Sequence, residues 1–148
     1  TLTAGVVTYT PDANYVGSDS FTYTVSDGDL TDEGMVSVTV ANVNHAPVAV
    51  DDAYTVFVNM PLTVSNQDGV LKNDSDLDGD NLIAILVDGT SHGSLQLNAD
   101  GSFVYTPAAD FYGTDSFTYK VFDGSAHSST VTVTISVQVP IFLPLING

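Results

Sequence analysis

The most constraining feature of the chain is an internal repeat. The segment VTYTPDANYVGSDSFTYTVSDG, which begins at Val7, returns as FVYTPAADFYGTDSFTYKVFDG from Phe103. The two segments lie 96 residues apart, which is about the size of one β-sandwich domain. The sequence therefore predicts one complete repeat at residues 45–138. It is preceded by the C-terminal half of another repeat at residues 1–44 and followed by an apolar tail at residues 139–148.

Apolar and polar residues alternate through the complete repeat, as in FTYKV from Phe117 to Val121. This period of two is typical of strands with one buried face, and turn pairs such as Asp100-Gly101 separate the alternating runs. The pattern predicts seven strands, at residues 53–58, 62–65, 81–88, 94–98, 103–106, 116–123 and 130–137. Because no stretch keeps a helical period, we expect an all-β fold, an Ig-like antiparallel β-sandwich.

Tyr119 stands two residues before Val121. This is the spacing of a tyrosine corner, in which a tyrosine hydroxyl bonds the backbone a few residues upstream, two positions ahead of the strand F cysteine of immunoglobulin domains. Val121 would then take the place of that cysteine in the core. The alternative is that both are simply inward residues of an alternating strand.

The charge balance excludes several kinds of partner. Eighteen acidic residues against two basic ones give a net charge of −16. Such a chain repels the phosphate backbone of nucleic acids and anionic membrane surfaces, so neither is an expected partner. The longest apolar stretch, PIFLPLI, is much shorter than the roughly 20 residues of a membrane span. We therefore expect no membrane insertion.

The usual catalytic constellations are missing from the sequence. The chain has no cysteine, which excludes disulfides, thiolate metal sites and cysteine nucleophiles. The spacing of His45, His92 and His127 matches neither a zinc site nor a catalytic triad. We therefore expect a protein that is not an enzyme.

Four segments carry a family resemblance. They are HAPVAVDDAYTV, VLKNDSDLDGDNL, HGSLQLNADGSFVYTP and FYGTDSFTYKVFDG. Together they resemble the signatures of bacterial cadherin-like or Ig-like tandem repeats of secreted adhesins and surface proteins. The resemblance implies an extracellular, calcium-dependent β-sandwich on the bacterial cell surface, without catalytic residues. The chain departs from the family at Val58 and Asn59, where an acidic pair is frequent, and at His45, where an aspartate is frequent.

The segment NDSDLDGD offers the best candidate for binding chemistry. It places Asp74, Asp76, Asp78 and Asp80 at alternate positions. Calcium takes six to eight oxygen ligands, and carboxylates of a turning loop can converge on one ion. The segment matches the first half of an EF-hand loop, but Ile85 stands where the bidentate glutamate belongs. The sequence predicts a Ca²⁺ site that is not an EF-hand, with a solvated acidic turn as the alternative.

Three further aspartates are candidate ligands of the same ion. In an Ig-like fold, the loop with Asp76 lies at the same end of the sandwich as the loop that contains Asp123. The entry of the repeat, with Asp51 and Asp52, is expected nearby. An ion there would stiffen the junction between repeats by cancelling charge that otherwise drives them apart. The alternative for Asp51 and Asp52 is that they are exposed residues at the start of a strand.

The apolar tail suggests a partner. We expect Val139–Ile146 of one subunit to pack on the half repeat of the next, a head-to-tail contact that repeats into a filament unless it closes into a ring. The partners are then copies of the chain itself or neighbouring repeats, with surface glycans as a further candidate. The predicted function is an extracellular structural or adhesive module, stiffened by calcium and assembled into a fibre by strand donation. The alternatives are a carbohydrate- or surface-binding adhesin tip and a noncatalytic appendage of a secreted enzyme.

Overall fold

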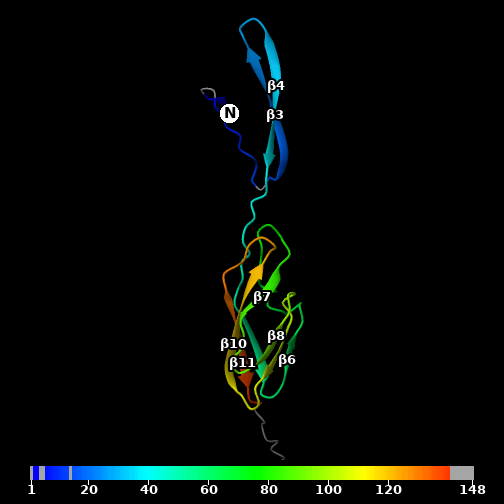
Figure 1. The fold of residues 1–148 in the computed structure, drawn as a ribbon, viewed down its shortest axis with the longest axis vertical. Coiled ribbons are helices and arrows are strands. Elements are labelled where there is room, and N and C mark those ends of the chain that lie inside the picture. Colours follow the sequence, from blue (N-terminus) through cyan, green and yellow to red (C-terminus); the bar gives the residue numbers. More distant parts are fainter. Residues whose placement is uncertain (1, 4–5, 14, 141–148) are drawn as a thin grey trace, which may run out of the picture. The chain divides into compact units, whose positions relative to one another are not determined.

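The computed structural model describes residues 2–3, 6–13 and 15–140, which form strands and no helix (Figure 1). The chain divides into two compact units, Thr1–Val43 and Asn44–Gly148. Unit 1 and unit 2 are used below for these two parts. The predicted donor strand falls largely on residues 141–148, which lie outside the described residues.

In residues 44–140, the described part of unit 2, seven strands lie in the places that the sequence predicts. Every end of a strand lies within three residues of its predicted position. The strands are β5 (Asp52–Phe57), β6 (Leu62–Val64), β7 (Ile83–Asp88), β8 (Gly93–Leu97), β9 (Phe103–Pro107), β10 (Gly113–Phe122) and β11 (Val131–Gln138). The alternation of apolar and polar residues is therefore a sufficient signal for these elements.

The seven strands form two sheets. One has the order β5-β11-β10-β7 and the other the order β6-β9-β8. Every pair of neighbouring strands is antiparallel except β5 and β11, which are parallel. The predicted Ig-like β-sandwich is confirmed, with this one parallel edge as a departure from a wholly antiparallel arrangement.

The core of unit 2 lies between the two sheets. Phe117, Tyr119 and Val121, which alternate along β10, are almost completely buried. Phe103 on β9 meets Phe117 edge to face, with ring centroids 5.5 Å apart. Because these side chains come from opposite sheets, the aromatic contact joins the two layers.

Tyr119 does not form the predicted tyrosine corner. Its hydroxyl donates to the carbonyl oxygen of Val70, 2.7 Å away in the connection between β6 and β7, rather than to the backbone a few residues upstream. The physical reason is the place of Tyr119 within β10, since a residue well inside a core strand points its ring across the sandwich. Val121 is buried, as expected for the residue that replaces the cysteine.

The described residues of unit 1 form two antiparallel pairs of strands. One pair is β1 (Leu2–Thr3) with β2 (Val6–Val7), and the other is β3 (Gly17–Ser26) with β4 (Thr31–Val40). By sequence, β3 and β4 are the counterparts of β10 and β11. Their registers differ, since Phe21 pairs with Val36 whereas its counterpart Phe117 pairs with Val133, which by sequence is the counterpart of Val38.

Candidate metal centre

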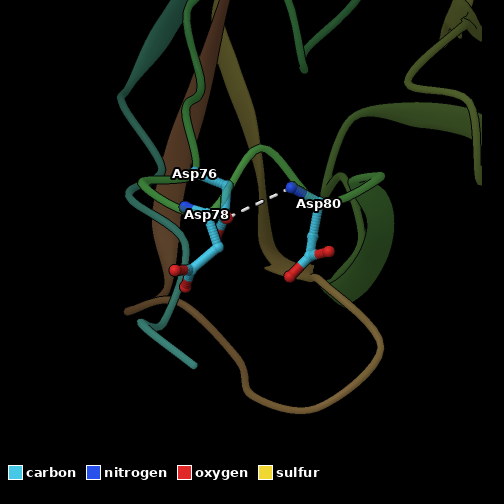
Figure 2. A group of neighbouring side chains, drawn as sticks. All are labelled: Asp76, Asp78 and Asp80. Atoms are coloured by element: carbon cyan, nitrogen blue, oxygen red, sulfur yellow. Dashed lines mark hydrogen bonds between the residues drawn. The ribbon is translucent and has the colours of Figure 1, made fainter. Parts of the chain in front are cut away.

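Three aspartates gather in the connection between β6 and β7. Asp76, Asp78 and Asp80 each offer a carboxylate oxygen, and these atoms all lie within 4.8 Å of one another (Figure 2). Oδ1 of Asp76 accepts hydrogen bonds from the backbone N–H groups of Asp78 and Asp80, at 2.9 and 3.2 Å. Gly79 has a positive φ of 77°, which an L side chain rarely adopts. The turn through Gly79 therefore brings the three carboxylates together.

The second oxygen of Asp76 has an unusual environment. Oδ2 is buried and has no hydrogen-bond partner among the described residues. A buried carboxylate oxygen without a donor is costly, so such groups are rare in native proteins. Calcium prefers carboxylate and other oxygen ligands. The donor set and this unpartnered oxygen therefore fit a calcium ion.

Asp78 forms hydrogen bonds with His45, in the segment that precedes β5. Its Oδ2 accepts the backbone N–H of His45 at 2.6 Å, and the Nδ1 atom of His45 lies 3.2 Å from both carboxylate oxygens. The backbone hydrogen bond from His45 is the largest of the causes that lower the pKa of Asp78. Asp78 is therefore ionised at neutral pH. The sequence analysis treated His45 only as a candidate zinc ligand or triad member and missed this contact, for which the sequence holds no signal.

Asp123 lies at the same end of the sandwich. Its Oδ1 accepts the backbone N–H groups of Ser125 and Ala126, both at 2.6 Å, and its Oδ2 accepts the side-chain amide of Asn44 at 3.0 Å. The hydrogen bond from Ala126 is the main cause that lowers the pKa of Asp123. The charge of Asp123 acts in turn on Asp78, whose pKa it raises slightly. Asp123 is thus near the cluster while its own oxygens are occupied by protein donors.

Asp52 and Asp74 face Tyr119 instead of the three-aspartate cluster. Their Oδ2 atoms lie 3.1 and 3.0 Å from the Tyr119 hydroxyl, and Oδ1 of Asp74 accepts the backbone N–H of Val50 at 2.8 Å. Burial is the main cause that raises the pKa of both carboxyl groups, that of Asp52 to about 6. The carboxyl groups of both residues thus make polar contacts with the hydroxyl group of Tyr119.

Asp51, which precedes β5, bonds to β11 and to the β6–β7 connection. Its Oδ1 accepts the backbone N–H of Thr132 at 2.7 Å, and its carbonyl oxygen accepts the side-chain amide of Asn73 at 3.2 Å. The structure therefore divides the seven predicted ligands. It brings together Asp76, Asp78 and Asp80, places Asp123 nearby, and engages Asp51, Asp52 and Asp74 in other contacts of unit 2.

The raised pKa of Asp52 leads to a prediction about pH. Between about pH 4 and pH 6 the folded protein holds a proton that the unfolded chain releases, so this group's contribution to the unfolding free energy falls as pH rises. Asp52→Asn keeps the shape without the charge. We expect it to be more stable than the parent at pH 7 by up to about 1 kcal/mol, because Asp52 is partly exposed and its charge is screened.

Urea unfolding at pH 4 and pH 7 in the presence of a chelator measures this effect. The difference between Asp52→Asn and the parent is expected to shrink toward zero at pH 4. A variant less stable than the parent at pH 7 would contradict the prediction, because it would mean that the folded protein needs the negative charge of Asp52.

The fold and the loop define a class of protein, an Ig-like β-sandwich module with an acidic cluster at one end. The bacterial cadherin-like domain matches residues 44–139, and the bacterial Ig domain matches residues 1–39. The chain therefore belongs to the bacterial cadherin-like domain family, and the predicted resemblance is confirmed. Bacterial domains of these two kinds are typical of surface or secreted proteins. Within the described residues, no helix has the length and apolar character needed to cross a membrane.

Similar solved structures include a group of glycoside hydrolases and a surface layer protein. Two endo-fucoidan hydrolases of glycoside hydrolase family 107 are 23% and 20% identical, with TM-scores of 0.44 and 0.41 over 85% and 86% of this chain. Domains 4–9 of the surface layer protein SbsC are 15% identical, with a TM-score of 0.39 over 87% of this chain. The matches cover only 19%, 23% and 19% of those chains. The comparison with curated proteins gave no match.

Proposed function

We propose that the chain is a noncatalytic structural module of a bacterial surface protein and that Ca²⁺ bound by Asp76, Asp78 and Asp80 stiffens it. The observation that carries this proposal is the buried, unpartnered Oδ2 of Asp76 beside two further carboxylates. Three like charges this close repel one another, and a divalent cation offsets that repulsion.

The position of the cluster explains why an ion would stiffen the module. Asp78 already holds the backbone of His45, which precedes β5, and Asp123 in the β10–β11 loop holds Asn44. The side chains of Asp78 and Asp80 point to the same side of their loop (Figure 2). An ion at this place would fix the β6–β7 connection while that connection holds the entry segment. The segment that precedes β5 would then be held rigidly against the sandwich instead of moving freely. A spacer module needs this rigidity.

Calcium is expected to raise the thermal stability of the chain. A ligand that binds only the folded state adds about 2.7 kcal/mol at 100 times its Kd, which raises the Tm of a domain of this size by about 10 °C or more. Scanning calorimetry with calcium and with a chelator measures the shift. In Asp76→Asn combined with Asp78→Asn, the shift should disappear.

A matched control removes the same charge elsewhere. Asp29→Asn combined with Glu33→Gln changes two exposed residues of unit 1 and should keep the full calcium response. If chelation leaves the Tm of the parent chain unchanged, the loop is only an acidic turn. A loss of the response in the control pair as well would show that net charge, and not the cluster, governs it.

Head-to-tail assembly into a fibre is part of this proposal. The donor strand Val139–Ile146 falls mostly outside the described residues, so its support comes from the apolar sequence of the tail and from the exposed apolar residues of unit 1. Removal of residues 139–148 is the test, with the mass of the assembly measured by light scattering. Assembly should disappear while unit 2 stays folded. An unchanged mass would exclude donation by the tail.

A further inference from the structure

The three aspartates of the cluster differ in how far the protein occupies their carboxylate oxygens. Oδ2 of Asp76 has no hydrogen-bond partner, and the carboxylate of Asp80 accepts no hydrogen bond, from any residue that the structure describes. Both oxygens of Asp78, in contrast, lie within hydrogen-bond distance of His45. Asp78 is therefore the member of the cluster whose two oxygens both face a donor of the protein.

His45 holds Asp78 through its backbone and through its side chain. The backbone N–H donates to Oδ2 at 2.6 Å, a contact that does not depend on the residue type. The imidazole adds a second contact, because its Nδ1 atom lies 3.2 Å from both carboxylate oxygens. In the tautomer that carries the proton on Nδ1, the imidazole donates between the two oxygens. The side chain of His45 can therefore be replaced while the backbone hydrogen bond is kept.

The imidazole of His45 competes with a cation for Asp78. A hydrogen-bond donor and a calcium ion approach the same lone pairs of a carboxylate oxygen, and both direct positive charge toward them. An ion that takes Asp78 as a ligand must therefore displace the Nδ1–H group or share the oxygens with it. The side chain of His45 is 54% exposed, so water can accept its hydrogen bond once it is displaced. Displacement is thus possible, and its cost is subtracted from the binding free energy of the ion.

We propose that His45 is a positioning residue whose side chain lowers the calcium affinity of the cluster by holding Asp78. Because this role concerns the same ion, it rests on the proposed function. Ligand charge and the rigidity of the site set the Kd of calcium sites, from roughly 10⁻⁷–10⁻⁵ M in sensors to roughly 10⁻⁴–10⁻³ M in extracellular modules. The hydrogen bond from the imidazole moves the cluster toward the weaker end of this range, where extracellular modules lie.

Calorimetric titration of the whole chain with calcium chloride tests the proposal. His45→Ala removes the imidazole and keeps the backbone N–H that donates to Asp78. We expect the Kd of this variant for calcium to be about three- to tenfold lower than that of the parent chain, which is the effect of releasing one hydrogen bond. The titrations are made at a single pH above neutrality, where an imidazole is mostly uncharged.

Two control variants check that the side-chain hydrogen bond is the cause. His45→Asn keeps a side-chain N–H donor close to the position of Nδ1 and has no titratable group, so its Kd is expected to equal that of the parent chain. Asn44→Ala removes the neighbouring hydrogen bond to Asp123 and leaves the contacts of Asp78 in place. Its Kd is also expected to stay unchanged.

The remaining outcomes overturn the proposal. An equal Kd for His45→Ala and the parent would mean that the imidazole does not compete with the ion, while calcium binding itself would stand. A higher Kd for His45→Ala would mean that the imidazole supports the site. If His45→Asn or Asn44→Ala binds calcium as tightly as His45→Ala, the cause is the charge of the imidazole or the loosening of the segment that precedes β5. An absence of calcium binding in every variant would contradict the proposed function as well.

Discussion

Replacing Asp115 with alanine is expected to destabilise unit 2 by about 3–5 kcal/mol. The side chain is 4% exposed and accepts hydrogen bonds from Ser91, His92, Tyr105 and Ser116. Burial alone would raise the pKa of Asp115, but these donors together lower it below its ordinary value, so the carboxylate is charged. Its removal leaves several donors without a partner, each at a cost of about 1–3 kcal/mol, and these costs are not additive.

Two further variants test whether the loss of stability comes from the missing hydrogen-bond acceptor and whether it requires burial. Asp115→Asn keeps one carbonyl acceptor and is expected to lose less stability than Asp115→Ala. Asp19→Ala changes the equivalent residue of unit 1, which is exposed, and is expected to cost less than about 0.5 kcal/mol. Urea unfolding gives the free energies, and hydrogen exchange locates the loss at the β7–β8 connection. Equal stability of Asp115→Ala and the parent would show that the network does not organise the fold.

The strands were predictable because their signal is local. Alternation from Phe117 to Val121 specifies an extended segment with one buried face, whatever the rest of the chain does. The turn at Gly79 was predictable for the same reason, since Asp-Gly pairs favour tight turns. The internal repeat then supplied the size of the domain. The fold class thus follows from local alternation and turns together with the period of the repeat.

The sequence did not allow a prediction of which aspartates form the cluster and which make other contacts. Alternating aspartates share one side only in an extended segment, whereas the chain turns from Asp76 to Asp80, where Oδ1 of Asp76 accepts the backbone N–H groups of Asp78 and Asp80. Asp74 therefore faces Tyr119, and only the aspartates after it gather around the turn. The shortest hydrogen bonds of Tyr119 and Asp78 are to backbone groups of Val70 and His45, which do not depend on the side chains of those two residues. Contacts of this kind leave no trace in the sequence.

Asp115 carried a signal that the sequence analysis left unused. The sequence DSFTY occurs in both copies, and in each copy a tyrosine lies ten residues before the aspartate, as Tyr9 does for Asp19 and Tyr105 for Asp115. An acidic residue at the start of an apolar strand, kept together with a tyrosine in two copies, indicates a buried hydrogen bond rather than a solvated charge. The structure shows the tyrosine–aspartate bond in both units, buried in unit 2 and exposed in unit 1.

The second large effect is expected from a matched pair of substitutions. Val121→Asn places an amide among apolar side chains of the core, where Val121 is 0% exposed. The loss of apolar burial and the unpaired amide together are expected to cost about 3–5 kcal/mol. Val25→Asn makes the same change at the equivalent residue of unit 1, which is 57% exposed, and is expected to cost less than about 0.5 kcal/mol.

Urea unfolding of the two variants, with hydrogen exchange to assign each loss to its unit, makes the comparison. Both variants change the same residue type in equivalent strands with nearly the same neighbours along the chain. The difference between their losses of unfolding free energy therefore measures the effect of burying the side chain under a second layer. A cost for Val25→Asn as large as that for Val121→Asn would mean that the side of β3 with Tyr23 and Val25 is covered in the purified chain. A small cost for both would contradict the burial of Val121 and with it the packing of β10 against the second sheet.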